Sequence, residues 1–300
     1  MRDAFLYILT SLIWGSTWLG IKFQLGVVDP EISVAYRFFL AAVLLLVFSL
    51  VRRLPLRFSL RDHLFMGLQG LTLFSLNYIA VYLAELYLTS GLVAVVFSVI
   101  IVFNVFLSAL FLGSPIRPRV LIGGGIGIAG LALVFWPEIA GFDLSGERAL
   151  GLLLSLGGTA VASLGNIVAA RNQRNSLPIV QTNAYGMAYG ALFTLMVAIA
   201  RGARLAFVPT FEYIASLVYL AVFGSVVAFG AYLTLLGRIG PDRAAYVAVI
   251  FPIVALILST LFEGLQWEPL AGFGIGLVVA GNAIALTRRR RPVECLSAAS

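Results

Sequence analysis

The chain has 300 residues, of which 61% are hydrophobic and only 11% are charged, and its mean hydropathy is +1.03. A soluble globular domain carries about a quarter charged residues, so this composition excludes a water-soluble fold. The formal net charge of +7 does not indicate nucleic-acid binding, because the arginines lie in the connections between apolar segments.

Apolar segments of about 20 residues, each long enough to cross the hydrocarbon core of a bilayer as a helix, follow one another along the chain. Segments such as Ala41 to Leu50 and Val93 to Phe103 are apolar on every side, whereas the strands of a membrane β-barrel alternate apolar and polar residues. The predicted helices span residues 4–25, 32–51, 63–86, 89–113, 119–136, 149–171, 177–200, 213–237, 243–264 and 269–287. The fold class is therefore all-α, a polytopic transmembrane bundle of ten helices.

The first segment resembles a signal peptide, but it runs past Trp14 and Trp18 without a small-residue cleavage site, so we expect a retained helix. With ten helices, 15 basic residues fall on one side of the membrane, and only Arg148, Arg201 and Arg204 fall on the other. The 15 are Arg2, Arg52, Arg53, Arg57, Arg61, Arg117, Arg119, Arg171, Arg174, Arg238, Arg243 and Arg288 to Arg291. The positive-inside rule then predicts that both termini are cytoplasmic.

The two halves of the chain resemble each other at a shift of 151 residues. Ser108, Phe111 and Gly113 fall on Ser259, Phe262 and Gly264, and in the next helix Gly123, Gly125, Ala129, Gly130 and Ala132 fall on Gly274, Gly276, Ala280, Gly281 and Ala283. A repeat of five helices crosses the membrane an odd number of times, so its second copy must be inverted. We expect residues 1–140 to form the first inverted repeat, with helices 1–5, and residues 141–300 the second, with helices 6–10, as in secondary transporters.

Three short segments carry a family resemblance. The sequence Ile13-Trp14-Gly15-Ser16-Thr17, followed by Lys22, and the junctions Leu88–Gly91 and Ile239–Ala244 resemble the ten-helix EamA branch of the drug/metabolite transporter superfamily. Within that branch the chain is most similar to bacterial aromatic amino-acid exporters of the YddG type. The resemblance implies a central cavity, amino acids as substrates and location in the bacterial inner membrane.

The third predicted helix carries a stripe of aromatic residues at which we expect substrate to bind. Phe74, Tyr78 and Tyr82 are spaced by four and share one helix face, with Asn77 beside it. Their ring faces suit an ammonium through cation–π attraction, although a packing stripe gives the same pattern. The further candidates for substrate binding are Trp14, Ser16, Ser163, Asn166 and Tyr246, with a structural role for Trp14 and interhelical hydrogen bonding by the polar residues as the alternative.

Pro252 is the one proline predicted in the middle of a span, and it frees the carbonyl of Ala248. We interpret it as a gating hinge, with a static kink as the alternative. Helices one, three, four, six, eight and nine are predicted to form the cavity. The small-residue patterns Gly123–Gly127, Gly186–Gly190 and Gly272–Gly276 favour close helix packing, so helices five and ten should be peripheral, either at the repeat interface or in a dimer.

No Asp or Glu lies within a predicted span away from the helix ends, which disfavours proton-driven extrusion of organic cations. Lys22 and Arg37 lie one or two turns from the outer surface. Either they guide a carboxylate into the mouth or, as is commoner, they extend to the interface or pair with Asp29 or Glu31.

A single histidine, His63, and a single cysteine, Cys295, build no metal site, and no nucleophile and base converge. We therefore expect no enzyme activity, no metal and no cofactor. The expected partners are the lipid bilayer and a small-molecule substrate, with no nucleic acid; a monomer suffices and a homodimer stays open. The predicted function is export of a broad set of amino acids by alternating access, the alternatives being multidrug or metabolite efflux and passive facilitation of another small solute.

Overall fold

The structure is a computed structural model that describes residues 2–24, 26, 28–88, 90–141, 146–263 and 269–286. Thr89, Gly264, Arg288 to Arg291 and Cys295 lie outside the described residues, as does the side chain of Lys22. Within the described part, all regular secondary structure is helical.

Several of the described helices follow one another end to end and together form one membrane-spanning column. In chain order they are α1 (Arg2–Lys22), α2 (Pro30–Val51), α3 (Leu60–Leu71), the π-helical segment η1 (Thr72–Leu76), α4 (Asn77–Ala84), α5 (Ser90–Phe97), α6 (Ile100–Leu112), α7 (Pro118–Val134), α8 (Trp136–Ala140), α9 (Glu147–Arg174), α10 (Ile179–Ala200), α11 (Phe211–Tyr219), the π-helical segment η2 (Leu220–Val227), α12 (Ala228–Ile239), α13 (Pro241–Ala244), α14 (Val247–Glu263) and α15 (Pro269–Leu286).

Ten helical columns result among the described residues, as the hydropathy pattern predicts. The third column is α3, η1 and α4, the fourth is α5 and α6, the eighth is α11, η2 and α12, and the ninth is α13 and α14. Six columns are long and apolar enough to cross a membrane by length and composition, and α7 and α15 are shorter apolar helices. The chain is thus an all-α, multi-pass membrane protein.

Turn and cap residues explain several of the helix boundaries. Proline occupies the first turn of α2 and α7, where its missing N–H removes no hydrogen bond. Ser59 and Asp62 form a reciprocal capping box at the start of α3. α6 ends at Gly113, whose φ of 62° is the left-handed conformation that glycine adopts without strain.

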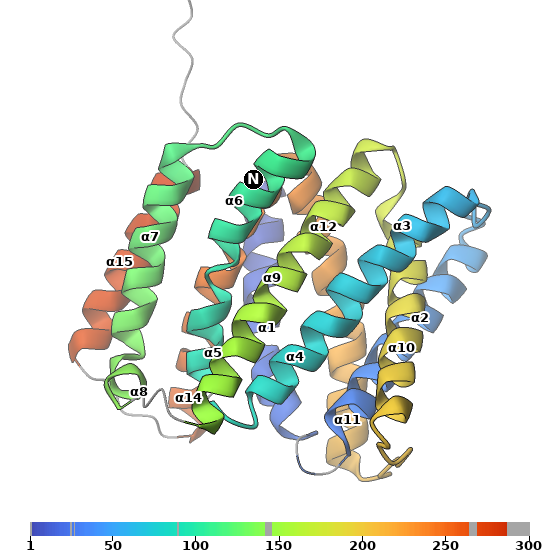
Figure 1. The fold of residues 1–300 in the computed structure, drawn as a ribbon, viewed down its shortest axis with the longest axis horizontal. Coiled ribbons are helices and arrows are strands. Elements are labelled where there is room, and N and C mark those ends of the chain that lie inside the picture. Colours follow the sequence, from blue (N-terminus) through green and yellow to red (C-terminus); the bar gives the residue numbers. More distant parts are fainter. Residues whose placement is uncertain are drawn as a thin grey trace, which may run out of the picture.

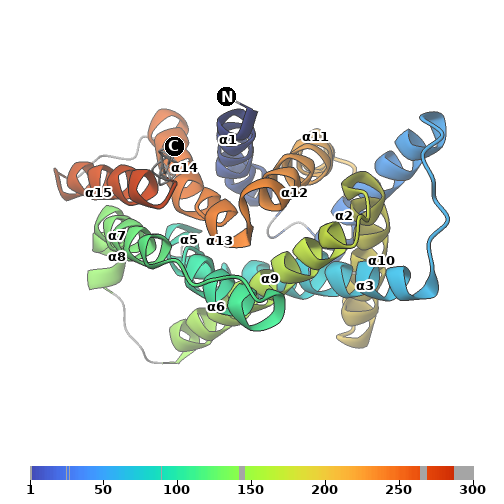
Figure 2. The same cartoon turned by 90° about the horizontal axis from the view of Figure 1, so that it is seen from above.

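The helices form two rows when viewed from above (Figure 2). α1, α12, α14 and α15 lie in one row, and α3, α5, α6, α7 and α9 lie in the other. The pairs α7–α15 and α2–α10 make extensive contacts and close the two ends of the assembly, as Figure 1 shows from the side. The centre between the rows is therefore bounded by α1, α4, α5, α6, α9, α12 and α14.

Glycines of α7 and α15 allow these two helices to touch along their backbones. A methyl group placed on Gly123 would lie 2.5 Å from the carbonyl oxygen of Gly281, and one on Gly130 would lie 2.6 Å from that of Gly274. Gly123 corresponds to Gly274 in the repeat, and Gly130 corresponds to Gly281. The contact of Gly123 with Gly281 is therefore equivalent to the contact of Gly274 with Gly130, as a two-fold axis between the repeats requires. The predicted packing role of the fifth and tenth helices therefore operates between the two repeats of one chain.

The prediction for one of the three glycine patterns is wrong. Gly272 and Gly276 meet no atom within 4 Å and face outward, whereas the packed glycines of α15 are Gly274 and Gly281. The error is one of helix face, since Gly272 and Gly276 lie two residues from Gly274 on a helix that turns about 100° per residue. Gly186 and Gly190 do pack closely, against Phe74 and Gly70 of the third column.

Both repeats contain a π-helical segment in the corresponding column. η1 interrupts the third column and η2 the eighth, and their residues are separated by about the same shift that aligns the two halves. A π-helical segment leaves carbonyl groups without their usual i+4 partner and is often found at functional sites. η1 contributes Leu73 to the cavity described next, and η2 contributes Gly224 and Ser225, which accept hydrogen bonds from the cavity-lining side chains of Trp14 and Arg37.

Candidate functional site

A cavity of about 100 Å³ lies between the two repeats. Its lining residues are Trp14, Thr17, Ile21, Arg37, Leu73, Asn77, Tyr78, Val81, Tyr82, Phe97, Ile100, Ala162, Asn166, Phe229, Tyr232, Ala245, Ala248 and Phe251. They come from the six predicted columns and, in addition, from the second column through Arg37. Side chains of α7 and α15 do not contribute to this lining.

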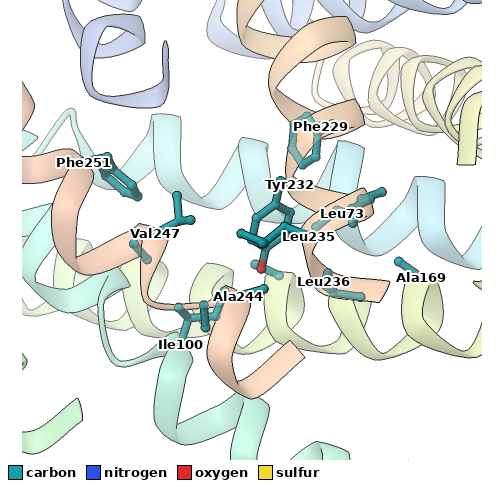
Figure 3. Close-up of a cluster of buried hydrophobic side chains, with 14 of the residues drawn as sticks. Leu73, Ile100, Ala169, Phe229, Tyr232, Leu235, Leu236, Ala244, Val247 and Phe251 are labelled. Atoms are coloured by element: carbon teal, nitrogen blue, oxygen red, sulfur yellow. The ribbon is translucent and has the colours of Figure 1, made fainter. Parts of the chain in front are cut away.

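Seven of the 18 lining residues are aromatic. Trp14 lies against Phe229 and Tyr232, with ring centroids 5.0 and 4.9 Å apart, and Phe229 contacts Phe74 at 4.9 Å. Figure 3 shows Phe229 and Tyr232 on one column, with Leu73 beside them and Phe251 across from them. The wall therefore fits an apolar or aromatic group.

The sequence from Trp14 to Thr17 is explained residue by residue. Trp14 donates from its indole nitrogen to the carbonyl oxygen of Gly224 in η2, at 3.1 Å, and Thr17 lines the cavity beside it. A methyl group on Gly15 would lie 2.9 Å from the carbonyl oxygen of Phe251, so only glycine lets α14 approach α1 here. Ser16 faces elsewhere and is hydrogen-bonded to the hydroxyl of Tyr219 at 2.6 Å.

Four polar atoms that belong to cavity-lining side chains have no hydrogen-bond partner among the described residues. They are Nη1 of Arg37, Oδ1 of Asn77, the hydroxyl of Tyr82 and Oδ1 of Asn166, and all four side chains are at least 95% buried. Leaving such a group unpaired costs about 1–3 kcal/mol, more for a charged one. Because buried polar groups are nearly always satisfied, these atoms are available to bind water or a solute in the cavity.

The side chain of Arg37 lies in the cavity wall and not at the membrane interface, where it was expected. It is 1% exposed and lines the cavity, and none of the ion pairs between described residues includes it. Glu31, its predicted partner, pairs with Arg201 at 2.8 Å instead, and the carboxylate of Asp29 accepts from the backbone N–H of Arg204 at 3.0 Å. The expectation that Arg37 extends to the interface or pairs locally is therefore wrong.

Five of the eight predicted substrate-binding residues line the cavity: Trp14, Asn77, Tyr78, Tyr82 and Asn166. Ser16, Ser163 and Tyr246 do not. Ser163 donates to Oδ1 of Asn104 at 2.6 Å, which turns it toward the neighbouring helix. Tyr246 is fully buried, its hydroxyl donating to the carbonyl oxygen of Val120, so it joins the ninth column to α7.

Pro252 lies inside α14 and follows Phe251, but it does not itself line the cavity. Ala248, whose carbonyl it frees, does line the cavity. Its role as a hinge stays a prediction.

Asn104 is a buried residue that the sequence analysis missed. Its Oδ1 accepts from Ser163 and, at 3.5 Å, from Asn166, while its Nδ2 donates to the carbonyl oxygen of Pro241 at 2.9 Å. It joins α6 of the first repeat to α9 and α13 of the second, at the end of the cavity toward the predicted cytoplasmic side. Nearby, Arg117 and Asp242 form an ion pair at 3.4 Å across the same junction.

Phe229 and Tyr232 were also missed, although the sequence contains a signal for them. A shift of 151 residues places Tyr78 on Phe229, and a shift of 150 places Tyr82 on Tyr232. The eighth helix thus carries the counterpart of the aromatic stripe on the third. No comparable signal marks Asn104.

Comparison with known proteins identifies similar chains. The profile of the EamA-like transporter family matches residues 1–136 and 149–287. The chain is 30% identical over 272 residues to the uncharacterized inner membrane transporter YedA of Escherichia coli strain K12, covering 89% of this chain and 85% of YedA. It is 26% identical over 295 residues to protein PagO of Salmonella typhimurium, covering 96% and 94% of the two chains, and 27% identical over 294 residues to the uncharacterized transporter YvbV of Bacillus subtilis, covering 96% and 93%.

A crystal structure of another protein superposes on this chain with a TM-score of 0.79 at 18% sequence identity. The superposition covers 95% of this chain and 96% of the other. At this identity the likeness concerns the fold alone.

Proposed function

The chain belongs to the EamA-like transporter family, and we propose that this membrane transporter exports amino acids, including aromatic ones, by alternating access around the cavity between its two repeats. This family consists of transporters and is not an enzyme family, in agreement with the prediction that the chain is not an enzyme. The substrate, the direction of transport and the orientation in the membrane belong to the proposal.

The observation that carries the proposal is the division of the cavity wall into two kinds of surface. Aromatic rings of Trp14, Phe229 and Phe251 offer an apolar surface, while Asn77 and Asn166 present carbonyl oxygens without partners. A neutral carbonyl oxygen accepts a hydrogen bond from an ammonium group, and an aromatic wall accommodates an apolar side chain. An amphipathic zwitterion such as phenylalanine or leucine matches both surfaces.

Multidrug efflux of organic cations is the second candidate, and the charge of the lining argues against it. None of the described side chains that line the cavity is acidic, and one of them, Arg37, is a cation. A fixed positive charge in a site of low dielectric repels a cationic substrate strongly. Passive facilitation differs from export in mechanism and not in the site, so only transport kinetics separate the two.

Reconstitution in liposomes tests the proposal. Purified protein should take up labelled phenylalanine and leucine with saturation, and preloaded unlabelled amino acid should accelerate uptake, as an alternating-access carrier requires. Labelled tetraphenylphosphonium and uridine serve as the organic cation and the nucleoside. Saturable uptake of the cation without amino-acid uptake would transfer the function to multidrug efflux, and non-saturable amino-acid flux without acceleration would indicate a passive pore.

The proposed orientation places both termini in the cytoplasm, since 15 basic residues lie on that side. Fusions at the C-terminus test it in intact cells. A fluorescent protein that requires the cytoplasm to fold should fluoresce, and an alkaline phosphatase that requires export should be inactive. The reverse pattern would refute the proposed topology.

A further inference from the structure

The side chain of Arg37 is held in one position by contacts from three directions. Its Nε donates to the hydroxyl of Ser225 at 2.9 Å, and Ser225 in turn donates to the carbonyl oxygen of Leu220 at 3.0 Å, within η2. Its guanidinium carbon lies 4.9 Å from the ring centroid of Tyr78 and 5.4 Å from that of Phe38. Such stacking positions a guanidinium without neutralising its charge.

One nitrogen of this guanidinium lacks a hydrogen-bond partner in the described part of the chain. Nη1 of Arg37 is buried and makes no hydrogen bond to a described residue, and the hydroxyl of Tyr82, on the next column and lining the same cavity, is in the same state. A buried charge within a membrane protein is costly unless an opposite charge or a set of hydrogen bonds satisfies it. The described residues supply Arg37 with a hydrogen bond to Ser225, with contacts to the hydroxyl oxygens of Tyr78 and Tyr82 and with two aromatic faces, but with no ion pair.

We propose that Arg37 is the carboxylate-binding residue of the transport site, with Tyr82 as a second donor, and that it makes the protein select solutes that carry a carboxylate. The proposal rests on the proposed function and specifies the substrate class of the same cavity: carboxylates with an apolar or aromatic body, amino acids among them. In this arrangement the carboxylate accepts from Nη1 of Arg37 and from the Tyr82 hydroxyl. An α-ammonium group then donates to Oδ1 of Asn77 or Asn166.

The contacts of Arg37 also change the role expected for Tyr78. The four-residue spacing predicted that the ring face of Tyr78 contacts a substrate ammonium, but a guanidinium already lies over that ring. A second cation there would be repelled by the first. Tyr78 therefore acts as a positioning residue for Arg37, and the ammonium of an amino acid binds elsewhere in the cavity.

Four probes with one aromatic body separate the chemical groups. L-Phenylalanine carries a carboxylate and an ammonium, 3-phenylpropionate only the carboxylate, phenethylamine only the ammonium, and 2-phenylethyl phosphate a different oxyanion. Each is added to purified protein in detergent, and its dissociation constant is obtained from the ligand-dependent rise in the unfolding temperature. Binding is thus measured without any assumption about transport.

The wild-type protein should bind phenylalanine and 3-phenylpropionate and should bind phenethylamine at least tenfold more weakly. Arg37→Gln should weaken binding of both carboxylates roughly 10- to 100-fold, the effect of losing one hydrogen bond to a charged group. The same substitution should leave phenethylamine binding unchanged or improve it. Arg37→Lys keeps the charge but not the planar geometry, so it should retain part of the preference.

Arg204→Gln is the matched control, because it removes the same charge from an exposed side chain on the same predicted face of the membrane. It should leave all four affinities unchanged. A carboxylate preference that persists in Arg37→Gln, or tighter wild-type binding of phenethylamine than of 3-phenylpropionate, would overturn the proposal. So would binding of the phosphate alone, or of none of the probes.

Failure of the proposed function gives a different pattern. If the protein binds 3-phenylpropionate through Arg37 but neither binds nor transports amino acids, the carboxylate assignment holds and amino-acid export does not. If amino acids are transported with equal kinetics by the wild type and by Arg37→Gln, export holds and the carboxylate assignment does not.

Discussion

The two π-helical segments occupy corresponding places in the two repeats, yet they accept hydrogen bonds from side chains of different kinds. Ser75 of η1 and Ser225 of η2 are 150 residues apart, and each accepts a hydrogen bond of 2.9 Å from the second helix of the opposite repeat. The donor to Ser75 is the hydroxyl of Thr194, a neutral group. The donor to Ser225 is the guanidinium of Arg37, a cation that lines the cavity and whose Nη1 has no hydrogen-bond partner among the described residues.

This difference separates the part of the molecule that builds the bundle from the part that recognises a solute. The duplication provides a symmetric scaffold, visible in the reciprocal glycine contacts of α7 and α15 and in the paired π-helical segments. Recognition of an asymmetric molecule needs an asymmetric site. Replacing a hydroxyl by a guanidinium at one of two equivalent junctions supplies it.

The largest effect is expected from breaking the symmetric scaffold. Gly130→Val places methyl groups against the carbonyl oxygen of Gly274 and the side chain of Leu277 and should destabilise the protein by about 3 kcal/mol, at the upper end for overpacking. Gly125→Val, on the same helix where no atom lies within 4 Å, should change stability by less than about 0.5 kcal/mol. Unfolding temperatures in detergent measure both, and equal losses would show that glycine packing does not hold the repeats together.

The next effect concerns the hydrogen bonds of Asn104, which join the two repeats beside the cavity. Asn104→Ala removes hydrogen bonds from Ser163 and to Pro241, so we expect the population open at this junction to rise roughly 5- to 30-fold, corresponding to about 1–2 kcal/mol. Ala245→Cys, in a background where Cys295 is replaced by Ser, reports opening by its labelling rate from the cytoplasmic side.

Ser98→Ala is the control for that experiment, because the buried hydroxyl of Ser98 donates to the carbonyl oxygen of Val95 in its own column and to no other described residue. Its labelling rate should match that of the parent. If both substitutions accelerate labelling equally, then Asn104 has no special part in closing the cavity.

Replacing each of the two serines by alanine compares the two junctions directly. Ser225→Ala leaves Nε of Arg37 without its acceptor and should weaken binding of 3-phenylpropionate roughly 5- to 10-fold through loss of positioning. Ser75→Ala removes a neutral hydrogen bond and should cost about 0.5–1.5 kcal/mol of stability without altering ligand preference. Equal changes in affinity in the two variants would argue that the two junctions are functionally alike.

The smallest effects are expected at the tyrosines of the third column. Tyr82→Phe removes the unpaired hydroxyl and should weaken carboxylate binding roughly 3- to 10-fold. Tyr78→Phe keeps the ring beneath Arg37 and should change it less than about twofold. Dissociation constants for 3-phenylpropionate measure both effects. A larger loss of affinity in Tyr78→Phe than in Tyr82→Phe would show that Tyr78, and not Tyr82, donates to the carboxylate.

The sequence by itself determined the number of helices, their approximate limits, the duplication and the family, because each depends on residues close together in the chain or on a fixed shift between its halves. Runs of apolar residues specify spans through their length, and the signature from Ile13 to Thr17 is contiguous. The aromatic stripe of Tyr78 and Tyr82 was readable for the same reason, since four-residue spacing fixes a common helix face.

Only the tertiary structure decided what Arg37, Ser163 and Asn104 do. Hydropathy places Arg37 near the end of a span, where an arginine normally reaches the interface, but its direction depends on Ser225, which is 188 residues away. Asn104 is likewise defined by partners 59 and 137 residues distant. In a bundle whose helices are apolar on all sides, the packing of distant helices selects which polar side chain faces the cavity, and no local pattern records that choice.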